Sequence, residues 1–250
     1  QNPDVARWGG IQGDSAGFKV GYDMMSATLK ANYKKFANKS IEVLDPVLVK
    51  TGATDFRTQI NQIAGQNLQG LILLLGGGEA VTFLKQAKPF GLMQSLKAVA
   101  DNNLNVSAGP SLKSDMPNNF VTSCMWQLDP YKQYPLAAPF AADWLAETKD
   151  PVVNPYAANS HTAVMSFAGA MKAAPAGDTA ALIAALETTT FDSVYGPLQY
   201  RREDHQLKVG PGYMELGPQA GDPGWRMVKF VRVPFEESAE PPTPGVAFSL

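Results

Sequence analysis

The sequence is poor in the side chains that most metal, redox and nucleophile sites require. It contains one cysteine, Cys124, and two histidines, His161 and His205, among 250 residues. A single cysteine excludes an intramolecular disulfide, and so small a set of thiols and imidazoles argues against a metal site built from them. Cysteine usage leaves the compartment open, because a reducing cytosol and a large exported domain are both compatible with it.

An excess of basic residues and a long apolar run are also missing. The formal net charge is −2, which gives no electrostatic footprint for nucleic acid. The longest apolar run, residues 70–75, is far shorter than the roughly 20 residues that a membrane-spanning helix needs. The 45% share of hydrophobic and 18% share of charged residues are ordinary for a globular protein. Because the chain begins at Gln1 without a signal peptide, we expect a processed or truncated start.

Familiar catalytic motifs are missing as well. The sequence has no His-Glu-x-x-His helix, and no Gly-Lys-Ser/Thr follows the Gly76–Gly78 run as a phosphate loop would require. The carboxylates of Asp14, Glu79 and Asp101 could converge, but nothing beside them supplies a nucleophile or a metal ligand. We therefore expect a protein that is not an enzyme and that holds neither cofactor nor metal.

What is present is an alternation of apolar strand-like runs and helical segments through residues 8–127. The runs that we expect as strands are Trp8–Asp14, Ser40–Val49, Gly70–Leu75, Leu96–Ala100 and Phe120–Gln127. The first helix is expected over Gly17–Phe36, in which Val20, Met24, Ala27, Ala31 and Phe36 recur at roughly helical spacing. A second helix is expected after Thr54 or Asp55, either of which could cap it. This alternation predicts an α/β fold with a doubly wound parallel sheet.

The rest of the chain has a different pattern. Helices are expected over Phe140–Thr148, Ser160–Ala174 and Thr179–Glu187, and strands over Gly196–Arg201, Gly212–Leu216 and Met227–Val233. From Glu236 onward, prolines among glutamate and serine predict a disordered tail, residues 236–250.

Four segments, in this order and spacing, carry a resemblance to a known family. They are Ile11-Gln-Gly-Asp-Ser-Ala-Gly17, Gly52-Ala-Thr-Asp-Phe56, Phe83-Leu-Lys-Gln-Ala87 with Gly91-Leu92, and Tyr195-Gly-Pro197 through Asp204-His-Gln206. The chain resembles the type I solute-binding proteins of ABC importers, the branched-chain amino-acid-binding group. The resemblance extends from residue 8 to about residue 233.

This resemblance implies a two-lobed type I periplasmic-binding-protein fold. Residues 1–127 would form the α/β core of the second lobe, and strands in 206–235 would return to it. Residues 128–205 would be helices of the first lobe, whose own sheet we expect upstream of Gln1. A missing first-lobe polypeptide is therefore an expected partner of this chain.

The same resemblance implies an extracytoplasmic, periplasmic receptor. It would bind an amino acid, a carboxylate or an aromatic acid between two lobes and deliver it to an ABC transporter permease. One alternative is a ligand-sensing module of a regulator built on the same fold, which an upstream helix-turn-helix or a downstream membrane span would favour. A less favoured alternative is a fragment of an α/β hydrolase or transferase, which substrate turnover would reveal. A receptor without a working cleft is a further alternative.

Ligands of open α/β sheets bind beyond the carboxyl ends of the strands, which locates the candidate site. The candidate ligand-binding residues follow three predicted strands: Asp14, Ser15, Ala16 and Phe18; Gly76, Gly77, Gly78 and Glu79; Asp101, Asn102 and Asn103. The family often has a tyrosine near the position of Ala16, so Phe18 could supply the aromatic wall instead.

Each of these residues also has a structural interpretation. Asp14 could hold a ligand ammonium group or cap the following helix, and Glu79 could contact the ligand or act as a first-turn acid. The glycine run could cradle a carboxylate or simply form a tight turn. Asp101 could anchor an ammonium group, with the two asparagines taking over for a ligand that has no amine.

Four residues outside these loops are assigned to structural roles. Cys124 is expected to be an inert thiol in an apolar strand, and Trp126 a core residue. His161 is expected to pack within a helix rich in alanine, and His205 to belong to a structural turn.

Overall fold

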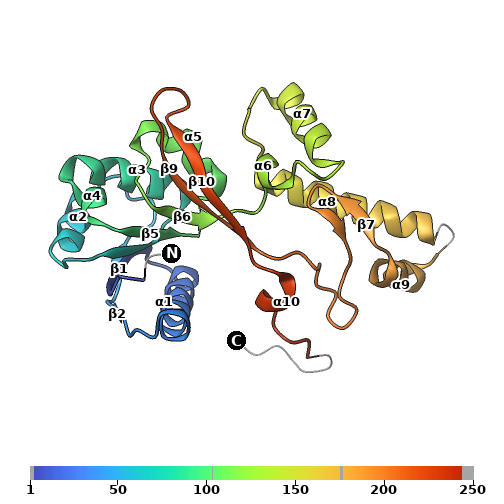
Figure 1. Cartoon of the computed structure of the whole chain (residues 1–250), viewed down its shortest axis with the longest axis horizontal. Coiled ribbons are helices and arrows are strands. Elements are labelled where there is room, and N and C mark those ends of the chain that lie inside the picture. The colour runs from blue at the N-terminus through green and yellow to red at the C-terminus, as the bar shows by residue number, and fades with distance from the viewer. Residues whose placement is uncertain (1–2, 103, 175–176, 244–250) are drawn as a thin grey trace. The chain divides into compact units, whose positions relative to one another are not determined.

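The structure is a computed structural model that describes residues 3–102, 104–174 and 177–243. Its residues divide into two compact units (Figure 1). Unit 1 comprises Gln1–Ser123 and Tyr213–Phe230, and unit 2 comprises Cys124–Gly212 and Val231–Leu250. Each unit is described by itself below.

Unit 1 is built on a mixed sheet of eight strands in the described residues, in the order β10-β9-β6-β5-β4-β1-β2, with β3 also paired to β1. The strands from β1 to β6 run parallel, whereas β9 is antiparallel to β6. The strand bounds are β1 Arg7–Gly13, β2 Glu42–Val43, β3 Val47–Val49, β4 Gly70–Leu74, β5 Ala98–Asp101, β6 Phe120–Ser123, β9 Gly212–Pro218 and β10 Trp225–Arg232. The predicted α/β class is confirmed, with antiparallel strands added at one edge.

Helices lie on both faces of this sheet, with α1 on one face and α2 to α5 on the other (Figure 1). Short 3₁₀ segments, labelled η, join several of them. The bounds are α1 Ala16–Ala37, α2 Arg57–Ala64, α3 Gly77–Ala87, η1 Lys88–Phe90, α4 Leu92–Ser95, η2 Asn105–Ser107, α5 Ala108–Leu112 and η3 Lys113–Asp115. Because both faces are covered, β4 is buried along its whole length, as its unbroken apolar run predicts.

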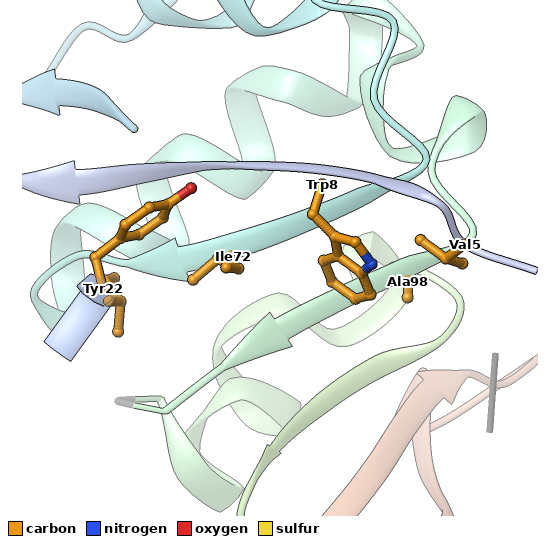
Figure 2. Close-up of a cluster of buried hydrophobic side chains, with 6 residues drawn as sticks. Val5, Trp8, Tyr22, Ile72 and Ala98 are labelled. Atoms are coloured by element: carbon orange, nitrogen blue, oxygen red, sulfur yellow. The ribbon is translucent and has the colours of Figure 1, made fainter. Parts of the chain in front are cut away.

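The core under α1 is formed by alternate residues of the central strands (Figure 2). Its buried members are Val5, Trp8, Tyr22, Ile72, Leu74 and Ala98. Gly10 makes room for Tyr22, because a Cβ atom at Gly10 would lie 2.2 Å from Cε2 of that ring. Gly10 is therefore a packing requirement of this face.

The buried face of α1 is not the one that contains Val20 and Met24. Phe18, Tyr22, Met25, Leu29 and Tyr33 contact the core, whereas Val20, Met24 and Phe36 are 57%, 66% and 76% exposed. The apolar residues Val20 and Met24 recur at helical spacing but do not form the buried face, because α1 carries two apolar stripes. Only the aromatic-rich stripe has the size to reach the sheet beneath Gly10.

The strand predicted over Ser40–Val49 is interrupted. The structure has β2 at Glu42–Val43 and β3 at Val47–Val49, with Asp45-Pro46 between them. Proline has no N–H to donate to a ladder, so it breaks pairing at this edge. The edge strand is thus split into two pieces that flank a turn.

The described residues of unit 2 contain five helices and a two-stranded hairpin, β7 with β8. The bounds are α6 Leu128–Tyr131, α7 Ala137–Thr148, α8 Pro155–Ala173, α9 Thr179–Thr188, β7 Phe191–Ser193 and β8 Gly196–Leu198. Helix α8 begins five residues before its predicted start, because Asn154 caps it and Pro155 occupies the first turn. The predicted tail begins with a short helix, α10 Phe235–Ser238, and residues 244–250 lie outside the described residues.

Candidate functional site

The three predicted loops follow adjacent parallel strands of unit 1. The sheet order β5-β4-β1 brings their carboxyl ends to one edge. Gln12 of β1 pairs with Leu74 of β4, so Asp14 and Gly76 both lie two residues beyond that pair. Asp101 pairs with Leu73 and therefore lies deeper in the sheet than either of them. We call residues 14–18, 76–79 and 101–102 the strand-end loops.

The loop after β1 leaves the Asp14 carboxylate free of capping. Ser15, not Asp14, is the N-cap of α1, and its Oγ accepts a hydrogen bond from Phe18 N at 3.4 Å. The backbone N–H of Asp14 donates to Val49 O at 2.7 Å, which fixes this loop to β3. The interpretation of Asp14 as the helix cap is therefore wrong, and its exposed carboxylate is available to a ligand.

Ala16 and Phe18 differ in how they face the strand-end edge. Ala16 is exposed at the first position of α1. The Phe18 ring packs on β1, since a Cβ atom at Gly13 would lie 2.6 Å from its Cδ2. The ring is thus half-buried against the sheet.

The loop after β4 is held by Glu79. Its Oε1 accepts from Gly52 N at 2.5 Å and its Oε2 accepts from Gly76 N at 3.3 Å, so the carboxylate joins two loops. This geometry is that of a first-turn acid at a helix N-terminus. Glu79 therefore shapes the edge from behind rather than presenting a free charge.

Gly77 and Gly78 are the open part of that loop. Both are exposed, and a Cβ atom on either would meet nothing within 4 Å. The first internal bond of α3 runs from Ala80 N to Gly76 O at 2.8 Å. The N–H groups of the first turn before it have no acceptor within the helix, and such donors favour an anion.

Asp101 is buried and engaged by its own chain. It is 5% exposed, and its Oδ2 accepts from Leu104 N at 2.9 Å and from Thr122 Oγ1 at 2.5 Å. These bonds tie the loop after β5 to β6. Asn102 is exposed and its carbonyl accepts from Ser123 Oγ at 3.3 Å, while the predicted residue Asn103 lies outside the described residues.

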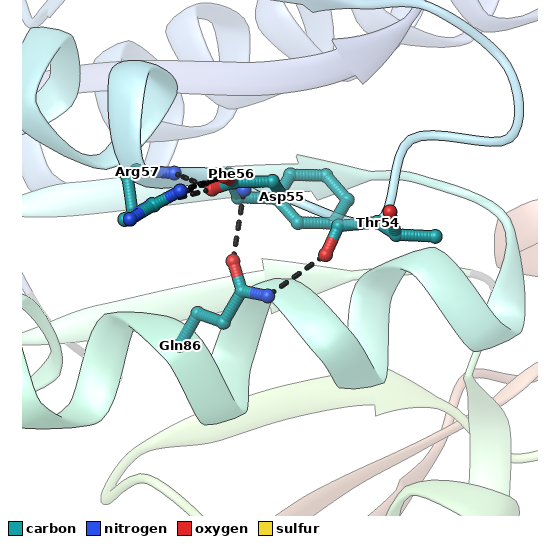
Figure 3. A network of polar contacts seen from close by, with 5 residues as sticks. All are labelled: Thr54, Asp55, Phe56, Arg57 and Gln86. Carbon is teal, nitrogen blue, oxygen red and sulfur yellow. Dashed lines mark hydrogen bonds and ion pairs between the residues drawn. The ribbon is translucent and has the colours of Figure 1, made fainter.

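The Gly-x-Thr-Asp-Phe and Lys-Gln-Ala segments meet behind this edge (Figure 3). The Gln86 side chain of α3 accepts from Phe56 N at 2.8 Å and donates to Thr54 O at 2.9 Å. Asp55 forms an ion pair with Arg57, whose hydrogen bonds lower the pKa of the Asp55 carboxyl to about 2. This network joins α2 to α3 and is structural.

Trp126 and Cys124 are buried as expected, whereas Nδ1 of His161 is buried without a hydrogen-bond partner among the described residues and the His205 side chain is 61% exposed. Trp126 is fully buried, and its Nε1 donates to Val194 O at 3.0 Å. Cys124 is buried, and burial raises the pKa of its thiol to about 12. The His161 ring packs on Phe140 with centroids 4.9 Å apart, and burial lowers its pKa. His205 contacts Glu187 Oε1 through Nε2 at 2.8 Å.

Sequence reasoning missed a second feature of unit 1, a surface pocket of about 850 Å³ beside α1. Its lining includes Gln12, Tyr22 and Asp45, none of which was predicted as a site residue. The alternation Trp8, Gly10, Gln12 could have placed Gln12 on the α1 side of β1. The break at Asp45-Pro46 that opens the pocket was hidden within a predicted continuous strand.

The described residues contain no candidate membrane span and no candidate metal cluster. No helix in this part of the chain is long and apolar enough to cross a membrane. No group of three or more histidine, cysteine, aspartate or glutamate side chains in the same residues is arranged to hold a metal ion.

Comparison with known proteins identifies one family. The family model described as periplasmic binding protein matches residues 3–214. No curated protein matches the chain. Solved structures do match it, and the chain spans about 60% of the length of the first of them.

Three of these structures illustrate the likeness. An amino-acid ABC transporter substrate-binding protein from Pseudomonas fluorescens Pf-5 has 18% identity and a TM-score of 0.72, covering 92% of this chain and 60% of its own. The leucine-, isoleucine-, valine-, threonine- and alanine-binding protein from Brucella ovis, in a closed conformation, has 20% identity, a TM-score of 0.71 and coverages of 97% and 61%. A solute-binding protein of an ABC transporter from R. palustris, in complex with benzoate, has 18% identity, a TM-score of 0.63 and coverages of 90% and 58%. At these identities the likeness establishes the fold.

Proposed function

The chain belongs to the periplasmic binding protein family, and on that premise we propose that it is the solute-binding component of an ABC importer. The family is one of binding proteins rather than of enzymes. The observation that carries the proposal is the family match over residues 3–214, which includes all three strand-end loops. In this proposal the protein acts in the periplasm and hands its solute to a transporter permease.

We infer that the solute is a small organic acid or an amino acid bound at the strand-end loops. The exposed first turn of α3 at Gly77 and Gly78 favours a carboxylate. The uncapped carboxylate of Asp14 favours an ammonium group at the same edge of the sheet. The relatives described as binding branched-chain amino acids and benzoate support a solute of this size and charge.

Asp101 takes a supporting role in this proposal. Its carboxylate already accepts two hydrogen bonds from its own unit, so it fixes the loop that carries Asn102. An ammonium anchor at this edge is better supplied by Asp14, which is exposed.

We propose that residues 1–127 and 206–235 form the second lobe and residues 128–205 helices of the first. The compact unit of Gln1–Ser123 with Tyr213–Phe230 supports this division. We propose that a first-lobe polypeptide supplies the sheet on which the helices of residues 128–205 pack.

An unpartnered apolar face in unit 2 supports such a polypeptide. Tyr156, Val164, Phe167 and Met171 of α8 are 64%, 67%, 50% and 52% exposed. Their spacing of eight, three and four residues sets them on one side of the helix. Ile183 of α9 is also 42% exposed. A stripe of this kind is typical of a helix that covers a sheet.

Screening by amide chemical-shift mapping tests the proposed site. The ¹⁵N-labelled chain is titrated with the twenty amino acids and with benzoate, each to millimolar concentration so that weak binding is detected. We expect a saturable shift at the amides of Gly77 and Gly78 for at least one compound. Shifts confined to other parts of the chain, or none for any compound, would reject the strand-end site.

A further inference from the structure

The pocket beside α1 is contained within unit 1. It runs between α1 and the interrupted edge strand, with Gln12 of β1 at its floor. Its volume of about 850 Å³ lies within the range of small-molecule sites in proteins. It shares Asp14, Ser15 and Ala16 with the strand-end loops, but Gly76–Glu79 and Asp101 do not line it. We call this feature the α1 pocket.

The broken edge strand creates the α1 pocket. At Asp45-Pro46 the chain leaves the ladder between β2 and β3, and Tyr22 Oη donates to Leu44 O at 2.7 Å to fix the turn. Beyond the break, Leu48 pairs with Gln12 across the sheet and is 53% exposed. Leu48 therefore forms an apolar wall of the pocket, and the hydrogen bond of Tyr22 fixes the turn beside it.

Gln12 gives the pocket a polar floor that the chain does not satisfy. The residue is 4% exposed, and its Oε1 is buried without a hydrogen-bond partner among the described residues. A buried amide oxygen without a donor is costly, so a ligand that donates a hydrogen bond to it would relieve that cost. Rotation of the amide about its last torsion presents either its oxygen or its nitrogen to a ligand.

The rim of the pocket carries unpaired negative charge. No ion pair of Asp14 or Asp45 is found among the described residues. Lys19 also lines the pocket, where it is paired with Asp23 at 2.7 Å and is attracted by the charge of Asp45. Asp14 and Asp45 are both exposed and both line the pocket. Lys30 also lines it, four helical turns along α1 from Ala16. The end of the pocket near Gln12 is thus suited to a cation.

We propose that the α1 pocket binds a small organic cation, a primary ammonium group on a short apolar stem. The ammonium group donates to Gln12 Oε1 and is attracted by Asp14 and Asp45, while the stem lies against Leu48. This site overlaps the proposed transport site at Asp14, so the two ligands would compete for that carboxylate, but it needs no residue of the β4 and β5 loops. A ligand here would occupy one lobe without bridging to another.

A matched pair of probes tests this proposal. The ¹⁵N-labelled full chain is titrated with n-butylammonium chloride and with sodium butyrate, which have stems of similar length and opposite charge. We expect saturable shifts at the amides of Tyr22, Ser26 and Leu48 with butylammonium only. Equal responses to both probes, or no response to butylammonium, would overturn the proposal. Butylammonium shifts centred on Gly77 and Gly78 would also overturn it and would point to the strand-end site.

Two variants and one control connect the response to the named residues. Gln12→Leu removes the side-chain amide. It is expected to weaken the binding of butylammonium by about tenfold or more, because a hydrogen bond to a charged group is lost. Asp45→Asn, on the exposed turn, is expected to weaken it by about two- to fivefold. Asp143→Asn changes the net charge equally on an exposed position of α7 and is expected to have no effect. Unchanged affinity in Asp45→Asn and in a folded Gln12→Leu would contradict the assignment.

Discussion

At the residue scale, two family-like segments owe their pairing to one side chain. The Gln86 side chain accepts a hydrogen bond from Phe56 N and donates one to Thr54 O. It thus satisfies both backbone groups of the turn that leads into α2. The sequence shows the two segments but not their contact, because 30 residues separate Phe56 from Gln86. The side chain acts as a bridge between α2 and α3, and its loss would leave both backbone groups without this partner.

Replacing Gln86 should therefore destabilise the chain. We expect Gln86→Leu to lower the free energy of unfolding by about 1–3 kcal/mol, because two backbone groups lose their partner. Urea denaturation followed by circular dichroism measures the change. Gln62→Leu, at an exposed position of α2, is the matched control and should change stability by less than about 0.5 kcal/mol. Equal effects of the two substitutions would show that the bridge contributes nothing.

Tyr22 gives a prediction in alkaline solution. Burial raises its pKa from 10.0 to about 12, so the folded chain holds the phenol proton more tightly than the unfolded chain. A raised folded-state pKa contributes stability that is present below pH 10 and is lost as the pH rises through about 12. Across that pH interval, the free energy of unfolding of the wild type should fall by about 2 kcal/mol more than that of Tyr22→Phe.

Urea denaturation at several pH values between 8 and 12 measures this difference. Tyr131 and Tyr195 are also buried, so the variant should show a reduced pH dependence rather than none. Tyr156→Phe, at a position 64% exposed, should behave as wild type. An identical pH dependence in wild type and Tyr22→Phe would refute the burial argument.

At the element scale, α1 shows where sequence periodicity is insufficient. The sequence predicts the length and position of α1 closely. It does not predict the buried face, because two apolar stripes have helical spacing and only the one that contains Tyr22 packs on the sheet. Periodicity reports that a helix has an apolar face, but the sheet decides which face is used. Gly10 was the available signal, because a strand glycine marks a close approach by a large side chain.

Paired alanine substitutions on α1 test the observed face. Leu29→Ala should lower the free energy of unfolding by about 1–3 kcal/mol, since Leu29 packs on the core. Met24→Ala, at a position 66% exposed, should change it by less than about 0.5 kcal/mol. Thermal and urea denaturation of both variants measure these values. The reverse order would show that the face with Met24 is the buried one.

The strand-end loops show a similar division between what sequence supplies and what it hides. Their location follows from alternation alone, because parallel strands bring their carboxyl ends to one edge. The roles of the individual residues do not follow from this alternation. Ser15 rather than Asp14 caps α1, and Thr122 of β6 donates a hydrogen bond to Asp101. Such partners come from neighbouring strands or from competition within one turn, and a linear pattern does not rank them.

At the scale of the whole molecule, the apolar face of α8 is the feature that most needs a partner. The proposed first-lobe polypeptide predicts a second component of roughly 12–16 kDa in the purified particle, a typical size for part of a domain. Native mass spectrometry, followed by denaturing mass spectrometry, measures it. In its absence, Phe167→Ser should reduce binding of an apolar dye to the 26.8 kDa chain without lowering stability by more than about 1 kcal/mol. A chain that is alone in the particle and binds no dye would contradict the proposal.

Contact between a solute and the backbone of Gly77 and Gly78 is tested by one calorimetric comparison. The affinity of the strongest solute found by chemical-shift mapping is measured for wild type, Gly77→Ala, Gly78→Ala and Gly65→Ala. The added Cβ atoms at residues 77 and 78 meet nothing within 4 Å, and the one at Gly65 makes only ordinary contacts of 3.6 Å, so all variants should fold. We expect the affinity for the solute to fall by about tenfold, or about 1.4 kcal/mol, in Gly77→Ala or Gly78→Ala and to be unchanged in Gly65→Ala. Equal affinity in all four proteins would contradict it.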